Sequence, residues 1–177
     1  MTPVYRRPFA LACLGLGVMV HSSAPAQTPP VAMSAPWAQA MCNAWNADAG
    51  LTDKLVESGW MKNDAGRGFK TMQIYRADCP KSGRIELQIA LRENKARCVY
   101  CGASRSEKLD SSADYLMWAE SSRWREMGAG EYGPMRAMMF GHLNFEGPKM
   151  EAMGNMGPFE GFLRLVGKVP GEWGTCA

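Results

Sequence analysis

The sequence predicts an α+β protein in which helices cover one face of a five-stranded, mainly antiparallel sheet. Three observations lead to this fold class. Residues 37–59 space their apolar side chains as a helix does, residues 69–103 alternate apolar and polar side chains as strands do, and residues 133–169 switch between the two periods. The sequence has no evident internal repeat, so we expect one domain.

The first 26 residues have the features of a secretory signal peptide. Arg6 and Arg7 precede an apolar run from Phe9 to Val20, and Ala24-Pro25-Ala26 provides the small residues of a cleavage site. The run is too short to anchor the chain in a bilayer. We therefore expect a periplasmic or secreted protein, cleaved near Ala26. In a weaker alternative, Ala12-Cys13 marks a lipoprotein site.

Residues 27–36 are rich in proline, alanine and small polar residues, which predicts a flexible leader before a single domain over residues 37–177. The signal peptide contains two of the 20 basic residues and none of the 17 acidic ones, so the mature chain would have 18 basic and 17 acidic residues. This near balance gives no excess of positive charge of the kind that binds nucleic acid or an anionic membrane. We expect no nucleic acid partner.

The five cysteines of the mature chain predict disulfides, because export leads to an oxidising compartment, and the odd number leaves at least one thiol unpaired. They are Cys42, Cys79, Cys98, Cys101 and Cys176. Spacing alone does not determine the pairing. We predict that Cys42 pairs with Cys176 and joins the two ends of the domain. Cys98 and Cys101 lie in a predicted strand, where residues three apart face opposite sides, so we expect no catalytic disulfide between them.

Three strands in succession predict an antiparallel meander, over residues 69–76, 84–92 and 96–103. The second strand has the clearest alternation. Its apolar side chains should form a dry face and its polar ones a wet face. The dry set is Ile85, Leu87, Ile89 and Leu91, and the wet set is Glu86, Gln88 and Arg92. Residues 113–120 and 142–146 are the fourth and fifth strand candidates.

The helices are predicted from apolar spacing and from capping residues. A first helix is broken near Gly50 and restarts at Thr52 or Asp53. A short helix follows Ser121 or Ser122, and another begins at Pro134, a residue suited to a first turn. The last helix, from about residue 149, contains several glycines and a proline and is either kinked or divided in two.

Two motifs give the sequence a family resemblance. They are Ala113-Asp114-Tyr115-Leu116-Met117-Trp118 and the run from Gly133-Pro134-Met135 to Phe145-Glu146-Gly147. The chain resembles the sterol carrier protein type 2 family of lipid-transfer domains over residues 69–166, although His142 stands where that family usually has lysine. The resemblance implies a five-stranded sheet covered by helices, with an apolar tunnel between the layers that accepts sterols, fatty acyl chains or isoprenoid lipids.

Burial of hydrocarbon would drive binding in such a tunnel, at about 0.8 kcal/mol for each methylene removed from water. Any single apolar residue at helical spacing is more often a core residue than a ligand contact. The many methionines favour a lining, since their flexible thioether chains adapt to irregular partners. The expected ligand-binding residues are Ile85, Leu87, Ile89, Met135, Met138, Met139, Phe140, Phe145, Met153, Met156, Phe159, Phe162 and Leu163.

These observations predict a lipid carrier that performs no chemical conversion and needs no cofactor. A lipid ligand is the expected partner, with donor and acceptor membranes as candidates. His142 is the one histidine of the mature chain and has no recognisable catalytic partner. The alternative function is Cu(I) binding through thioethers, because three-residue spacings within two groups of methionines place thioethers on one helical face. These groups are Met135, Met138 and Met139, and Met150, Met153 and Met156. Their expected burial beside phenylalanines argues against it.

Overall fold

The computed structural model describes residues 28–177. The expected signal peptide and its cleavage site near Ala26 lie outside these residues. In the described part of the chain, none of the helices has both the length and the apolar character needed to cross a bilayer.

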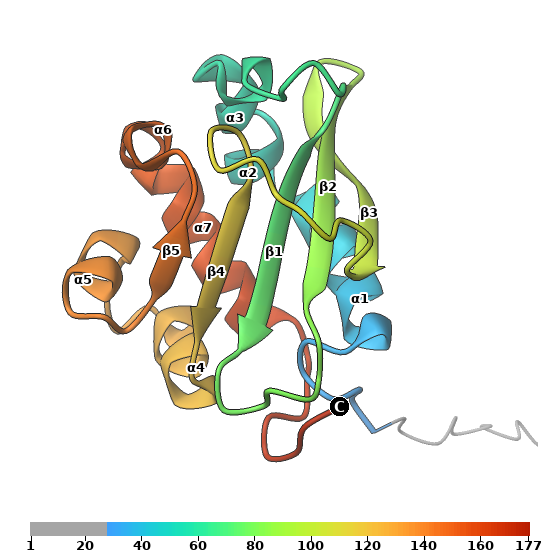
Figure 1. Cartoon of the computed structure of the whole chain (residues 1–177), viewed down its shortest axis with the longest axis vertical. Coiled ribbons are helices and arrows are strands. Elements are labelled where there is room, and N and C mark those ends of the chain that lie inside the picture. The colour runs from blue at the N-terminus through green and yellow to red at the C-terminus, as the bar shows by residue number, and fades with distance from the viewer. Residues whose placement is uncertain (1–27) are drawn as a thin grey trace, which may run out of the picture.

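The sheet has five strands in the order β3-β2-β1-β4-β5 (Figure 1). They are β1 (Lys70–Arg76), β2 (Ile85–Arg92), β3 (Lys95–Ala103), β4 (Tyr115–Ala119) and β5 (Asn144–Glu146). Strands β1, β2 and β3 form the predicted antiparallel meander, and β4 pairs antiparallel with β5. Only the central pair, β1 and β4, is parallel. The predicted fold class, α+β with a mainly antiparallel five-stranded sheet, is confirmed.

The helices follow the predicted pattern, including its breaks. They are α1 (Ala35–Ala47), α2 (Ala49–Thr52), α3 (Lys54–Glu57), the 3-10 helix η1 (Trp60–Lys62), α4 (Ser121–Ala129), α5 (Pro134–Met139), α6 (Lys149–Gly154) and α7 (Met156–Lys168). The first helix is divided at Asp48, whose side chain accepts a hydrogen bond from the Gly50 amide and starts α2. The last predicted helix is two helices, α6 and α7, which meet at Asn155.

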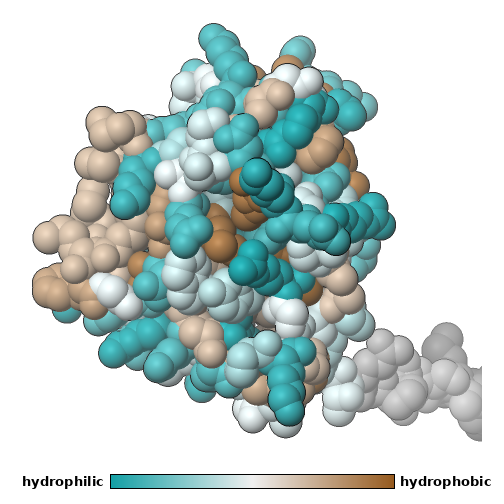
Figure 2. All heavy atoms as spheres, viewed as in Figure 1, coloured by the Kyte–Doolittle hydropathy of each residue, from teal (hydrophilic) through white to brown (hydrophobic). Residues whose placement is uncertain are grey.

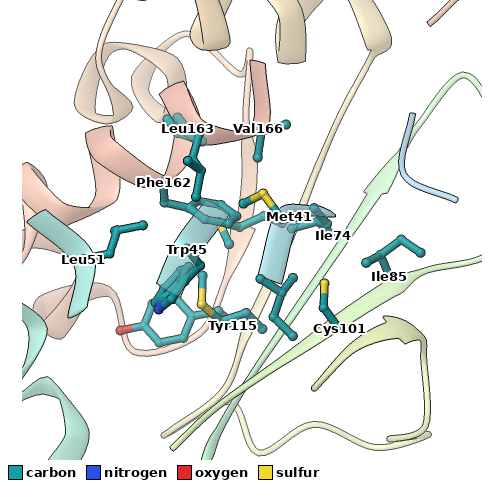
Figure 3. Packing of buried hydrophobic residues seen from close by; sticks show 14 of the residues in the cluster. Met41, Trp45, Leu51, Ile74, Ile85, Cys101, Tyr115, Phe162, Leu163 and Val166 are labelled. Carbon is teal, nitrogen blue, oxygen red and sulfur yellow. The ribbon is translucent and has the colours of Figure 1, made fainter. Parts of the chain in front are cut away.

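The helix layer covers one face of the sheet and forms the core with it. Helix α1 packs on β3, and α7 packs on α4 and α1 behind the sheet (Figure 1). Figure 3 shows how side chains of the two layers meet in this core. Those labelled there are Met41, Trp45, Leu51, Ile74, Ile85, Cys101, Tyr115, Phe162, Leu163 and Val166.

The opposite face of the sheet is not the open, wet face that the alternation predicted. The segment after β3, residues 104–114, crosses in front of β2 and β1 to reach β4 (Figure 1). Glu86 is completely buried beneath it and accepts hydrogen bonds from the backbone amides of Arg105 and Ser106 at 3.0 and 2.8 Å. The alternation therefore identified the two faces of β2, but it contained no information about the loop that covers the polar one.

Strand β3 departs from regular alternation at a β-bulge. Leu87 pairs with Cys101 and Ile89 with Cys98, so one extra residue of β3 lies between these two pairs. The extra residue, Val99, brings both cysteines to the same buried face. The expectation that Cys98 and Cys101 face opposite sides is therefore wrong.

Two disulfides are present, and neither is the predicted one. Cys42 of α1 pairs with Cys98 of β3, and Cys79, in the turn after β1, pairs with Cys176 near the C-terminus. The prediction that Cys42 pairs with Cys176 is wrong because α1 lies on β3, whereas the C-terminal segment returns to the end of β1. Cys101 is a free, buried thiol, and burial raises its pKa to about 12.

The expected flexible leader is partly folded. Val31 forms a parallel bridge with Glu172, and the Ala32 amide donates to the Glu172 carbonyl at 2.7 Å. Ala32 and Met33 are both buried. Backbone pairing of residues 30–32 with the C-terminal segment thus connects the two ends of the domain, a connection that was predicted to be a Cys42–Cys176 disulfide.

Candidate functional site

A small apolar cavity lies between the helix layer and the sheet, with a volume of about 30 Å³. Its lining residues come from α1–α3, η1, β1, β4 and the start of α7: Trp45, Leu51, Leu55, Trp60, Met72, Tyr115, Met117, Asn155, Pro158, Phe159 and Phe162. Pockets that hold drug-sized ligands have volumes of roughly 300–1,000 Å³. The cavity is therefore much smaller than such a pocket, and the apolar tunnel stays a prediction.

A buried polar cluster borders the cavity through Trp60 and Tyr115. Trp60 Nε1 donates to the Tyr115 hydroxyl at 2.8 Å, and that hydroxyl donates to the Glu151 carboxylate. Lys70 Nζ donates to Glu151 Oε1 at 2.6 Å and to the Asn63 carbonyl at 2.7 Å. Each of these groups is satisfied by protein partners, so the cluster ties α6 to β1 and η1.

Lys70 is the most unusual member of this cluster, because its side chain is fully buried although it carries an ammonium group. Desolvation lowers its pKa, and the hydrogen bond to Glu151 opposes that shift. The ammonium nitrogen also lies 4.5 Å from the centre of the Trp60 ring, a favourable cation–π distance. Burial raises the pKa of the Tyr115 hydroxyl, and its bond to the Glu151 carboxylate raises it further. Since the groups of this cluster are paired with one another, the pKa shifts indicate that the cluster positions α6 on the sheet.

Asn155, at the junction of α6 and α7, is the exception to this pairing. Its Nδ2 donates to the Glu151 carbonyl at 2.8 Å. Its Oδ1 is buried without a hydrogen-bond partner, and the residue lines the cavity. A buried acceptor left unpaired costs about 1–3 kcal/mol.

A second depression lies on the outside of the molecule, at the β5 edge of the sheet. This methionine groove has a volume of about 380 Å³ and lies between α5, β5 and α6. Its lining residues are Met135, Met138, Met139, Gly141, Leu143, Asn144, Phe145, Lys149, Ala152 and Met153. Figure 2 shows apolar side chains gathered on this side of the molecule, over α5 and α6 of Figure 1. Among residues 28–177, five of the seven exposed large apolar side chains lie on α5, on α6 or at the residue directly after α5: Met135, Met139, Phe140, Met150 and Met153.

Aromatic rings separate the groove from the cavity. Phe145 lines the groove, and its ring centre lies 5.5 Å from that of Tyr115 and 5.9 Å from that of Phe159. Tyr115 and Phe159 line the cavity. The two depressions are therefore divided by one layer of side chains.

The predicted ligand-binding residues divide among three environments. Phe159 and Phe162 line the cavity, whereas Met135, Met138, Met139, Phe145 and Met153 line the methionine groove. Ile85, Leu87, Ile89 and Leu163 are buried core residues outside both linings, Met156 is half-buried, and Phe140 is exposed. Their contact with a bound lipid stays a prediction.

Sequence reasoning missed most of the cavity lining. We had chosen apolar residues of β2, but the cavity lies under β1 and β4, which contribute Met72, Tyr115 and Met117. The alternation of Tyr115 and Met117 could have indicated them. Trp45 and Trp60 had no comparable signal, because their positions depend on how the helices lie on the sheet.

The two motifs have structural roles. The buried Asp114 carboxylate accepts hydrogen bonds from the Arg67 guanidinium and from the backbone amides of Thr71 and Asp110, the latter two at 3.1 and 2.9 Å. Gly147 has a φ of +141°, and a Cβ atom there would lie 2.5 Å from the Asp114 carbonyl oxygen. These residues hold β4 beside the segment that follows β5.

Between residues 28 and 177, no group of three or more His, Cys, Asp or Glu side chains is arranged to hold a metal ion. His142 packs edge-on against the Tyr132 ring, with ring centres 4.9 Å apart.

Comparison with known proteins agrees with this architecture. The model of the SCP-2 sterol transfer family matches residues 58–160. A crystal structure of sterol carrier protein 2 is similar, with a TM-score of 0.50 and 18% identity over 77% of this chain and 98% of that chain. A solution structure of a conserved hypothetical protein from Thermus thermophilus, described as possibly a sterol carrier protein, has a TM-score of 0.48 and 15% identity over 83% of this chain and 97% of that chain.

No curated protein matches the chain. The family match extends from the end of α3 into α7 and so includes the whole sheet, the buried polar cluster and the methionine groove. It spans more than half of the sequence. The chain belongs to the SCP-2 sterol transfer family.

Proposed function

We propose that the protein binds and carries a hydrophobic lipid between its helix layer and its sheet, without converting it chemically. The observation that carries this proposal is the apolar cavity under α7, which is bordered by a buried polar cluster and is separated from an exposed methionine groove by one aromatic layer. Family membership supports the same class of function.

Binding requires the small cavity to expand. The rings of Phe145 and Phe159 are the side chains that must separate for the groove and the cavity to join. Met72 and Met117 on the cavity wall can change rotamer at low cost, since methionine has an unbranched chain. Burial of ten methylenes would contribute about 8 kcal/mol, at about 0.8 kcal/mol each, which offsets the loss of aromatic contacts of about 0.5–1.5 kcal/mol per pair.

The methionine groove is where we propose that the protein docks on a lipid bilayer. Exposed apolar side chains can enter the boundary between headgroups and acyl chains, and nearby cations can face the headgroups. Lys149 lines the groove, and Arg136 is exposed on α5. The groove also leads toward the cavity through Phe145. A bilayer at this face would place lipid beside its expected path of entry.

Docking is tested by sedimentation with vesicles of phosphatidylcholine containing one-fifth phosphatidylglycerol. We expect Met139→Asp combined with Met150→Asp to lose most of the bound fraction. Leu91→Asp is the matched control, since Leu91 is also an exposed apolar residue but lies on β2. Equal loss in the control, or no loss in the double variant, would contradict docking through the groove.

Export to an oxidising compartment is consistent with the two disulfides. The proposed location is therefore outside the cytoplasm, in the periplasm or secreted. A lipid carrier there would move its ligand across an aqueous space between membranes.

Lipid carriage is tested on protein purified from an oxidising compartment. Organic extraction and mass spectrometry should recover a co-purified lipid, and long-chain lipids or sterols should raise the melting temperature. Leu51→Phe, in the cavity wall, should reduce both effects, whereas Val99→Phe on the exposed side of β3 should not. Absence of both a lipid and a thermal shift in the unaltered protein would overturn the proposal.

Cu(I) binding is the second candidate, and one observation favours it. Four thioethers line the methionine groove, and Met135, Met139 and Met153 are exposed, so the argument from burial does not hold for them. If Cu(I) binds there, it should raise the melting temperature, Met153→Leu should remove that effect, and Met41→Leu in the core should keep it. A Cu(I) response that survives Met153→Leu would rule out this site.

A further inference from the structure

We propose that Asn155 makes the cavity selective for lipids whose polar end is a hydroxyl group, over lipids that end in a carboxylate. The inference rests on the proposed function and deepens it, because it assigns a chemical class to the ligand. It is carried by the one cavity-lining residue, within residues 28–177, that has a buried side-chain acceptor without a partner, Asn155 with its Oδ1.

The orientation of the Asn155 amide is fixed by its neighbour. Nδ2 donates to the Glu151 backbone carbonyl at 2.8 Å, and the reversed amide would place two carbonyl oxygens against each other. The oxygen must therefore be the unpaired atom. Asn155 is only 9% exposed, so bulk water does not satisfy it.

The other polar groups on the cavity wall have partners. Trp45 Nε1 donates to the Ala96 carbonyl at 2.8 Å, and Trp60 Nε1 donates to the Tyr115 hydroxyl at the same distance. Tyr115 in turn donates to Glu151, whose charge is paired with Lys70. Within residues 28–177, Asn155 Oδ1 is thus the one buried side-chain acceptor of the cavity lining without a partner, and a ligand could bond to it without breaking an existing bond.

The chemistry of this acceptor defines the head group. A hydroxyl donates one hydrogen bond to Oδ1, whereas an ether or an ionised carboxylate has no hydrogen to donate. A carboxylate head group beside Oδ1 would also approach the Glu151 backbone carbonyl, which accepts a hydrogen bond from Asn155. It would approach the Glu151 side-chain carboxylate as well, which accepts a hydrogen bond from the cavity-lining Tyr115. Long-chain alcohols therefore fit the cavity better than fatty acids of the same length.

A single buried water is the rival partner for Oδ1, because a cavity of about 30 Å³ is large enough for one. A structural water would satisfy the oxygen in the same way whatever lipid entered. The two explanations differ in whether the head group of the lipid changes its affinity.

The test compares three 16-carbon probes: 1-hexadecanol, hexadecyl methyl ether and hexadecanoate. Binding to the full mature protein can be followed by tryptophan fluorescence, since Trp45 and Trp60 line the cavity. We expect 1-hexadecanol to bind about tenfold more tightly than either other probe, a difference of about 1.4 kcal/mol, which is near the upper end of the range for one net hydrogen bond. Asn155→Leu should bring the affinities for 1-hexadecanol and its methyl ether to within about twofold of each other.

Asn43→Leu, at an exposed asparagine of α1, is the matched control and should keep the tenfold preference. If Asn155→Leu fails to fold, the three-probe comparison on the unaltered protein decides alone. Equal affinities for the three probes would overturn the inference and leave lipid carriage intact. Failure of every probe to bind would count against the proposed function as well.

Discussion

The two edges of the sheet, at β3 and at β5, differ in whether the apolar residues of the neighbouring helices are buried or exposed. On the β3 side, α1 is held by the Cys42–Cys98 disulfide, and Met41 is completely buried. On the β5 side, α5 and α6 leave Met139 and Met150 exposed by 73% and 78%. The same residue type therefore fills the core in one region and forms a surface in the other. Methionine content alone does not distinguish a packed core from a binding face.

The largest expected effect is loss of the disulfide on the β3 side. Replacing Cys42 and Cys98 together with alanine should lower the free energy of unfolding by about 4 kcal/mol, because the bridge closes a long loop in the unfolded chain. Urea denaturation of the oxidised protein measures this. Lipid binding should persist under folding conditions, since neither cysteine lines the cavity. Loss of lipid binding in a variant that still folds would contradict the distinction between a packed region beside β3 and a binding region beside β5.

The next largest effect is expected from the buried ion pair between Lys70 of β1 and Glu151 of α6. Lys70→Met leaves the mostly buried Glu151 carboxylate without its counter-charge and should cost about 3 kcal/mol. Lys54→Met, which removes the exposed pair with Glu57, should leave stability nearly unchanged, because water screens that pair. Chemical denaturation of both variants at pH 7 makes the comparison. Equal effects would mean that the buried pair does not fasten α6 to the sheet.

Matched methionine substitutions test the comparison at single residues. Met41→Ala removes a fully buried side chain and should cost at least about 2 kcal/mol. Met139→Ala, on the exposed groove, should cost less than about 0.5 kcal/mol. Thermal or urea denaturation of the two variants provides the values. A large cost for Met139→Ala would show that the groove is part of the core.

At neutral pH the smallest effect on stability comes from the ionisation of the buried thiol of Cys101, because both the folded and the unfolded chain then keep the proton. Its pKa is raised to about 12 in the folded protein from an ordinary value of 9.0. Between these values the unfolded chain loses the proton while the folded chain keeps it, so the free energy of unfolding falls as pH rises from 9.0 toward about 12. Cys101→Ala should flatten this dependence. At mildly alkaline pH, iodoacetamide should label Cys101 after denaturation and leave it unlabelled in the folded protein.

The sequence predicted the elements of the fold much better than their contacts. Periodicity identified all five strands, and glycine and proline placed the division of the last helix near Asn155. The pairing of Cys42 with Cys98 depends on the position of α1 across β3, which is set by tertiary packing and has no local signal. The bulge at Val99 likewise reversed the expected facing of Cys98 and Cys101.

The candidate site was predicted in part for the same reason. Helical spacing selected Phe159 and Phe162, which line the cavity, but it could not distinguish them from Met135 and Met139, which line the outer groove. That distinction depends on whether another layer covers the helix. Helix α7 packs against α1, α2 and α4 behind the sheet, whereas α5 lies beside β5 at the edge of the sheet (Figure 1). Asn155 gave no signal, because an unpaired amide oxygen is visible only in three dimensions.

Hydrogen–deuterium exchange with and without bound 1-hexadecanol tests most directly whether lipid occupies the space under α7 and enters from the β5 side. We expect the ligand to change amide protection in β5, α6 and the first half of α7, and to leave α1 and β3 unchanged within error. Protection confined to α1 and β3, with β5 and α6 unaffected, would contradict this account.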